Sequence, residues 1–144
     1  MLAAMPLPAT NVEVRTRSTM ASTVDVLATE AACDVLRAGG NAVDAAIAAN
    51  AVLAVVGQHL CGLGGDLFAL VHHGVGLPAC LNASGRAGAG ADPGRLLVEG
   101  HMAMPHRHDV RSATVPGVVD GWVLLHERYG SVPMGDVLAA SIDH

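Results

Sequence analysis

The most apolar stretch of the chain, Ala42 to Val56, restricts the possible folds more than any other feature of the sequence. It reads as a helix that is apolar around its whole circumference, interrupted only by Asp44 and Asn50. Asn41 is placed to cap it, with Asp44 as the partner in a capping box. The stretch is shorter than the ~20 residues that a bilayer needs, so we predict a buried helix and no membrane partner. Other elements must cover it on all sides.

A shorter helix is predicted just before this one. Thr29 is placed as its N-cap, and Glu30 lies in the first turn, where a negative charge is favourable. Arg37, followed by Gly39 and Gly40, closes the helix. We therefore expect a helix of two turns.

Two strands are predicted after the apolar helix. The loop Cys61 to Asp66 leads into the continuously apolar run Leu67 to Val71, which is typical of a strand in a sheet covered on both faces. Pro78 to Asn82 is a plausible partner strand. The stretch from Ser84 to Gly94 is rich in Gly and Ala and indicates a loop, with a weak helical turn predicted at residues 93–99.

Two further helices are predicted near the end of the chain. Pro116 stands at the start of the first, whose apolar positions recur at helical spacing, and Gly130 closes it. These apolar positions are Val118, Trp122, Leu125 and Tyr129. Pro133 opens the second helix, which runs to His144, so we expect the chain to stop inside an element.

The domain organisation that follows is a single module. Residues 1–19 mix Pro, Thr, Arg and Asn without periodicity and are expected to form a loose N-terminal arm. Residues 20–144 contain no repeat and no linker that would divide them, and their length suits one domain.

Composition excludes several classes of partner and location. The net charge of -5, with no basic block, makes nucleic acid an unsuitable partner. Cys33, Cys61 and Cys80 lie in apolar or Gly-rich surroundings without CxxC spacing, and we expect buried, reduced thiols. The first ten residues lack the features of a signal peptide. Both observations favour a cytoplasmic protein.

The motifs do not call for a cofactor. Glycines at positions 62, 64 and 65 lie between a helix and a strand, whereas a phosphate-binding loop follows a strand and opens a helix. His101, His106, His108 and Asp109 have metal-binding side chains, but their spacing matches no zinc pattern and favours a solvated loop. We therefore predict neither a nucleotide cofactor nor a metal, and we find no candidate for a catalytic nucleophile.

Arg86 is the one candidate binding residue. It stands in a Gly-flanked, uncharged loop directly after a predicted strand, where its guanidinium could meet a carboxylate with two parallel hydrogen bonds. From the pattern alone, an ordinary surface arginine remains the favoured interpretation.

Four segments resemble the N-terminal part of the gamma-glutamyltranspeptidase family, in order along residues 20–144. They are LATEAACDVLRAGGNAVDAAIAANAVLAVV, CGLGGDLFALV, LNASGRAG and ATVPGVVDGWVLLHERYGSVP. The string GGNAVDAA within the first is highly specific.

The resemblance implies an α+β fold, namely an incomplete part of the four-layer αββα sandwich of N-terminal nucleophile hydrolases. It also implies a precursor that cleaves itself, so that a Thr at the new N-terminus of a small subunit becomes the nucleophile. Nothing in residues 1–144 corresponds to this Thr, so we expect no catalytic residue here and a missing C-terminal part or small subunit as partner. Arg86 matches the arginine that grips the α-carboxylate of the substrate.

The resemblance leaves the substrate open. Family members typically have an acidic residue and a Pro around this arginine, where the chain has Gly85-Arg86-Ala87-Gly88, and their glycine loop lacks Asp66. The chain is in this respect more similar to transpeptidase-like acylases and amidohydrolases. Glutathione or another gamma-glutamyl amide is the expected substrate, with another small amide as the alternative. A non-catalytic remnant that binds partners, or a degenerate truncated product, also remains open.

Overall fold

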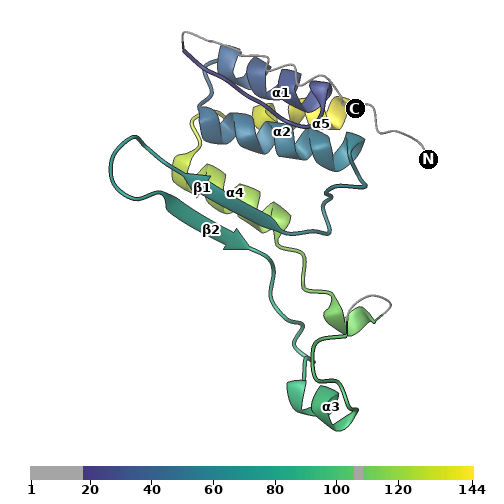
Figure 1. Ribbon diagram of the computed structural model, residues 1–144. Coiled ribbons are helices and arrows are strands. Elements are labelled where there is room, and N and C mark those ends of the chain that lie inside the picture. Colours follow the sequence, from purple (N-terminus) through teal and green to yellow (C-terminus); the bar gives the residue numbers. More distant parts are fainter. Residues whose placement is uncertain (1–17, 106–108) are drawn as a thin grey trace, which may run out of the picture.

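The computed structural model describes residues 18–105 and 109–144, so most of the predicted arm and two of the loop histidines, His106 and His108, lie outside the described residues. Its elements are α1 (Val26–Arg37), α2 (Ala42–Val56), β1 (Leu67–Val71), β2 (Ala79–Ala83), α3 (Pro93–Val98), the 3-10 turn η1 (Val110–Ser112), α4 (Val118–Tyr129) and α5 (Met134–Asp143). In Figure 1 the helices α1, α2, α4 and α5 and the β1–β2 hairpin form one body, from which a smaller lobe with α3 projects.

Helix α2 lies at the centre of the body and packs against α1, α4 and α5 (Figure 1). The predicted capping box is confirmed. The Asn41 side chain accepts hydrogen bonds from the Val43 and Asp44 amides at 2.8 and 3.1 Å, and the Asp44 carboxylate accepts one from the Asn41 amide at 2.9 Å. Three helices thus cover most of α2, while Val55 and Val56 at its end remain partly exposed.

The predicted start of α1 is wrong. Asp25, not Thr29, caps the helix, because its carboxylate accepts from the Leu27 amide at 2.8 Å and the Ala28 amide at 3.4 Å. The helix therefore begins at Val26 and has 12 residues instead of two turns. Thr29 lies inside it and donates its hydroxyl to the Asp25 carbonyl at 3.0 Å, as threonines within helices commonly do. Glu30 accordingly falls beyond the first turn.

The core is built from small side chains, which allow the helices to approach closely. One cluster joins α1 to α2 and consists of Ala28, Ala31, Ala32, Ala45, Ala49 and Val52. The other joins α2 to α4 and α5 and consists of Ile47, Ala48, Ala51, Val118, Trp122, Leu125 and Val137. Trp122 is the one large anchor, and its indole N–H donates to the Asn50 side chain at 2.8 Å. The polar residue within the apolar helix is thus satisfied.

The turn between α4 and α5 is bound to the start of α2 through Asp44, whose side chain is fully buried. Its carboxylate accepts from the Ser131 hydroxyl at 2.6 Å and from the Ser131 amide at 3.1 and 3.2 Å. Beside it, the Asn41 side-chain amide donates to the Tyr129 carbonyl at 2.6 Å. The capping box of α2 therefore also holds a turn that is distant in the sequence.

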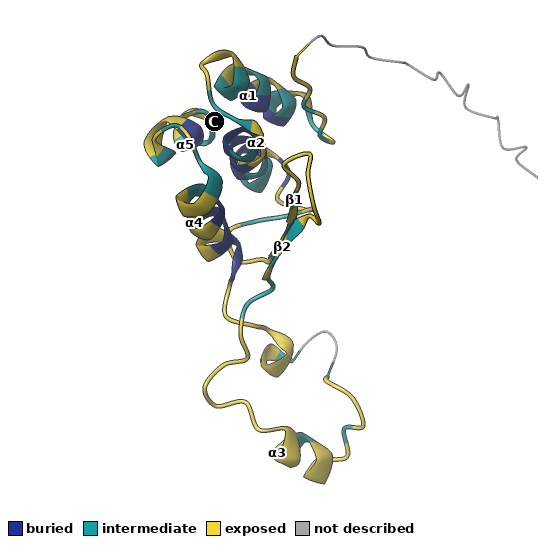
Figure 2. Cartoon of the chain, turned by 90° about the vertical axis from the view of Figure 1, so that its left-hand side faces the viewer, coloured by how far each residue is buried: buried dark blue, intermediate teal, exposed yellow. Residues whose placement is uncertain are grey.

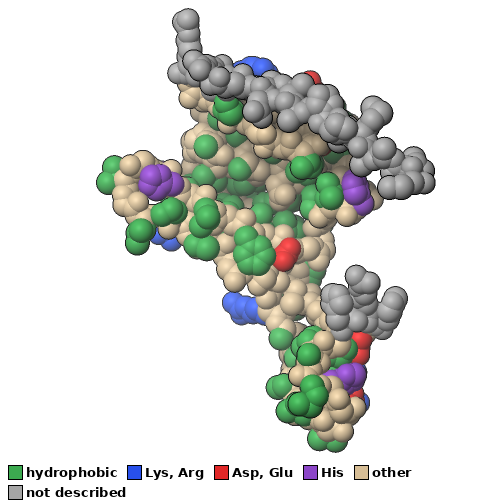
Figure 3. Space-filling view, in the orientation of Figure 1, with side chains coloured by type: hydrophobic (Ala, Val, Ile, Leu, Met, Phe, Trp, Pro, Cys, Tyr) green, Lys and Arg blue, Asp and Glu red, His purple; other side chains and the backbone are tan. Residues whose placement is uncertain are grey.

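The two strands pair antiparallel, with Leu67 opposite Ala83 and Val71 opposite Ala79. The strand prediction is confirmed to within one residue, but the expected cover on both faces is not found. The inner side chains pack on α2 and α4, whereas Phe68 and Leu70 on the outer face are 61% and 75% exposed. Within the described residues, the sheet has no second layer over this face, where hydrophobic side chains gather in Figure 3.

The projecting lobe is almost entirely exposed, as Figure 2 shows for α3 and the turn beyond it. Neither α3 nor η1 contains a buried residue. Ion pairs join its parts, with Arg111 bonded to Glu99 at 2.5 Å and to Asp109 at 2.7 Å. The lobe is therefore held by polar contacts and by its two connections to the body.

The prediction of buried cysteines is wrong, because Cys33 and Cys61 are half-buried and Cys80 is exposed on the outer face of β2. All three are unpaired. In the described part of the chain, no helix is long and apolar enough to cross a membrane.

Candidate functional site

Arg86 lies just beyond the end of β2, where the body passes into the lobe (Figure 1). Its side chain is exposed, and no carboxylate of residues 18–105 or 109–144 forms an ion pair with it. Its backbone is held, because the Arg86 carbonyl accepts a hydrogen bond from the Val115 amide at 2.9 Å. The guanidinium is therefore free to bind an anion, on a backbone that is fixed locally.

The chain returns from the lobe beside Arg86. Gly85 has φ +83°, and a Cβ atom there would overlap the carbonyl oxygen of Val115. A Cβ atom on Gly117 would overlap the carbonyl oxygen of Ala83 and lie 2.8 Å from the Gly85 nitrogen. Only glycine fits at these two positions, because the two backbones are in direct contact.

The glycine loop, residues 61–66, contacts the start of α4, directly after the segment that holds Arg86. The Gly65 carbonyl accepts hydrogen bonds from the Gly117 amide at 3.1 Å and the Val118 amide at 3.2 Å. These are orphan donors at the N-terminus of α4, and a backbone carbonyl satisfies them in place of a bound anion. The loop thus attaches the start of β1 to the start of α4.

Of the candidate metal ligands in the lobe, His106 and His108 lie outside the described residues, and Asp109 is paired with Arg111. Hydrogen bonds from the Arg111 side chain, and then from the Arg111 backbone amide, lower the pKa of Asp109 to about 2. Its carboxylate accepts from the Arg111 guanidinium at 2.7, 3.0 and 3.1 Å. Among residues 18–105 and 109–144, no three His, Cys, Asp or Glu side chains are grouped as metal ligands.

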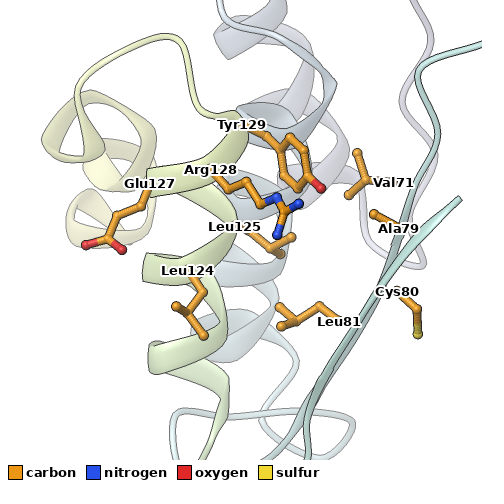
Figure 4. A pocket seen from close by; sticks show the side chains of 9 residues that line it. All are labelled: Val71, Ala79, Cys80, Leu81, Leu124, Leu125, Glu127, Arg128 and Tyr129. Carbon is orange, nitrogen blue, oxygen red and sulfur yellow. The ribbon is translucent and has the colours of Figure 1, made fainter.

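A separate hollow of about 400 Å³ lies between β2 and α4. Figure 4 shows Leu81 and Leu125 on its floor, with the Arg128 and Tyr129 side chains at its rim and the Cys80 sulfur pointing away. The Arg128 guanidinium lies 5.5 Å from the centre of the Tyr129 ring. This hollow does not include Arg86.

Sequence reasoning singled out Arg86 but not the segment that holds it, Thr114 to Gly117. The available signal was the Val-Pro-Gly string directly before a predicted helix. This string is typical of a helix start, and nothing local shows that it lies against a loop 30 residues earlier. In the structure α4 begins at Val118, so Pro116 precedes the helix instead of opening it.

The fold and the sequence both match proteins of known family. The chain superimposes on the crystal structure of gamma-glutamyltranspeptidase from Helicobacter pylori with a TM-score of 0.80 and 29% identity, covering 91% of this chain and 38% of that one. The fold is therefore part of an N-terminal nucleophile hydrolase, the α+β class predicted above. Residues 28–144 also match the family model of gamma-glutamyltranspeptidase. The chain belongs to the gamma-glutamyltranspeptidase family.

Two curated relatives show the range within the family. The chain is 41% identical over 119 residues to the glutathione hydrolase-like YwrD proenzyme of Bacillus subtilis, covering 82% of this chain. It is 42% identical over 97 residues to the oxamate amidohydrolase proenzyme of Klebsiella pneumoniae, covering 67% of this chain. The chain spans only 22% and 18% of the length of these relatives.

Proposed function

We propose that this chain provides the scaffold and the carboxylate-binding arginine of an amide hydrolase or acyl transferase. In this proposal Arg86 binds the α-carboxylate of the substrate, and a Thr nucleophile comes from polypeptide outside these 144 residues. The observation that carries it is the exposed guanidinium of Arg86, which has no ion-pair partner in the described part of the chain, on a backbone fixed at the end of β2. A guanidinium with no carboxylate partner of its own is available to bind one bidentately.

The chemical contribution of the chain is then binding and orientation. Two parallel hydrogen bonds from Arg86 would fix the carboxylate end of the substrate and thereby set the distance of its amide from a nucleophile. In the family the freed N-terminal amine of the Thr can act as its base, so the proton transfer needs no residue of this chain.

A gamma-glutamyl amide is the substrate we propose first, since the relatives include glutathione hydrolase-like proteins. A different small amide is the second candidate. It is favoured by the 42% identity to an oxamate amidohydrolase and by the uncharged surroundings of Arg86, Gly85-Arg86-Ala87-Gly88. Oxamate and gamma-glutamyl amides both carry a carboxylate that Arg86 would bind, although it is bonded directly to the amide carbon in oxamate and separated from it by three carbons in a gamma-glutamyl amide.

A non-catalytic role is the remaining alternative. The exposed outer face of the hairpin, with Phe68 and Leu70, gives a surface through which an inactive remnant could pair with another protein.

The three unpaired cysteines support our further proposal of a reducing, cytoplasmic location.

The proposal is tested with Arg86→Ala and Arg86→Lys in the complete enzyme that contains this chain. We expect KM for gamma-glutamyl 4-nitroanilide to rise roughly ten- to hundredfold, the range for losing hydrogen bonds between charged groups. Arg37→Ala is the matched control, because Arg37 is also exposed, on α1, and its ion pair among the described residues is with the nearby Asp34. Unchanged kinetics in both Arg86 variants would refute the role.

A further inference from the structure

The two connections between body and lobe run side by side and form a neck, defined as residues 84–86 and 114–117. The Arg86 carbonyl accepts from the Val115 amide at 2.9 Å, and the Thr114 hydroxyl donates to the Ser84 carbonyl at 3.0 Å. The two hydrogen bonds bracket Gly85, so they fix the backbone on both sides of the residue that precedes the arginine.

The neck is also in contact at the level of the backbone. Gly85 and Gly117 leave no room for a Cβ atom, since each lies directly against the opposite segment. At this separation the segment of Arg86 cannot slide along residues 114–117 without breaking the hydrogen bonds. The direction in which the Arg86 side chain leaves the backbone therefore depends on the neck.

The neck is in turn attached to the core. Gly117 and Val118 donate their amides to the Gly65 carbonyl, and the Val118 side chain is buried in the cluster with Trp122. Residues 114–117 are thus rigidly joined to α4 on one side. On the other side they continue into the exposed lobe, which has no buried residue in α3 or η1 to hold it.

Within the neck, Thr114 makes a contact that mutation can remove selectively. Its side chain is exposed, and its hydroxyl donates to a single carbonyl, that of Ser84. Water can replace that donor, so removing it costs little stability. The neighbouring bond from Val115 comes from a backbone amide and cannot be removed in this way.

We propose that Thr114 is a positioning residue for substrate binding, which holds the segment 84–86 so that Arg86 presents its guanidinium in one direction. This inference rests on the proposed role of Arg86. Without the Thr114 hydroxyl, the segment samples more conformations, and the substrate must pay the entropy of ordering it on binding. The effect falls on binding of the carboxylate and leaves the chemical step unchanged.

The test is a double-mutant cycle of Thr114→Val with Arg86→Ala in the complete enzyme. Thr114→Val keeps the β-branched shape and removes the hydroxyl, and Thr114→Ser restores it. We expect Thr114→Val to raise KM for gamma-glutamyl 4-nitroanilide by about two- to tenfold with kcat unchanged, which corresponds to one lost hydrogen bond. Thr114→Ser should return KM to the wild-type value.

Two further comparisons separate positioning from a merely structural role. In the Arg86→Ala background, Thr114→Val should raise KM no further, because the group that it positions is gone. With an analogue whose α-carboxylate is replaced by a carboxamide, Thr114→Val should have no effect in either background. Ser112→Ala is the matched control, since it removes an equally exposed hydroxyl bond, to the Asp109 carbonyl at 2.7 Å, within the lobe.

The outcomes distinguish the two proposals. If Arg86→Ala raises KM but Thr114→Val does not, the positioning role is refuted and the role of Arg86 stands. If the effects of Thr114→Val and Arg86→Ala on KM are additive, the hydroxyl is only structural. The same holds if Thr114→Val raises KM equally for gamma-glutamyl 4-nitroanilide and for its carboxamide analogue. If Arg86→Ala has no effect, both proposals fail. Thr114→Ala is the second variant should Thr114→Val not fold, and the same outcomes apply to it.

Discussion

Replacing Asp44 with Ala is expected to be the most damaging polar substitution in the body. The carboxylate is fully buried and accepts hydrogen bonds from three donors, namely the Asn41 backbone amide, the Ser131 backbone amide and the Ser131 hydroxyl. All three lose their acceptor in Asp44→Ala. Hydrogen bonds to charged groups contribute about 1.5–3 kcal/mol each, but Ser131 is exposed enough for water to replace part of the loss. We expect the free energy of unfolding to fall by about 2–4 kcal/mol.

Urea unfolding of the 144-residue chain, followed by circular dichroism, measures this change. Ser131→Ala should cost about 1 kcal/mol, because it removes the hydroxyl donor and leaves the amide in place. Asp34→Ala is the control, since Asp34 forms an exposed pair with Arg37 that contributes at most about 1 kcal/mol. A free energy for Asp44→Ala within about 0.5 kcal/mol of the wild type would show that the carboxylate does not hold the α4–α5 turn.

The same group predicts a dependence on pH. Burial raises the pKa of Asp44, but the hydrogen bonds from Ser131 and Asn41 and the nearby His126 outweigh it, so the pKa is lowered. The unfolded chain therefore binds this proton more readily than the folded one. The contribution of Asp44 to the free energy of unfolding is fully present above the ordinary aspartate pKa of about 3.9. It is lost as pH falls through the pKa that Asp44 has in the folded chain. The urea midpoint of the wild type should drop more steeply below about pH 4 than that of Asp44→Ala.

Three further substitutions test the packing and the lobe. Gly121→Ala should destabilise the body by about 1–3 kcal/mol, because its Cβ would lie 2.7 Å from the Leu67 side chain. Gly135→Ala, with open space around it, should be neutral or stabilising. Equal urea midpoints for the two variants would contradict this. Trp122→Ala should cost about 3–5 kcal/mol in the same assay, and a loss below about 1 kcal/mol would mean that the indole is not an anchor. In a carboxyl NMR titration Asp109 should have a midpoint at about 2, and Arg111→Ala should return it to the ordinary range.

The helices could be predicted in outline from the sequence because their signals are local. The capping box of Asn41 and Asp44 involves residues three apart, and the structure confirms it. The prediction for the start of α1 is wrong because local signals allow more than one N-cap. Asp25 and Thr29 are both suitable caps, and only the actual hydrogen bonds from the Leu27 and Ala28 amides decide between them.

The environment of each strand could not be predicted in this way. The apolar run Leu67 to Val71 predicts the strand correctly. Apolar residues at every position do not show, however, whether other elements cover one face of the sheet or both, and here Phe68 and Leu70 are exposed. Cover is a property of the whole assembly of layers. The exposure of Cys80 follows from the same cause, because it lies on the open face of the hairpin.

Arg86 shows the same division for the candidate site. Its type, its glycine neighbours and its place after a strand are read directly from the sequence, and with them its suitability for binding a carboxylate. Its exposure, its lack of an ion-pair partner among the described residues and its contact with residues 114–117 depend on segments far apart in the chain. Propensity and capping act within a few residues, so the sequence by itself determined the elements and the family. Contacts across the fold are set by packing, and the tertiary structure alone decided how the arginine is held.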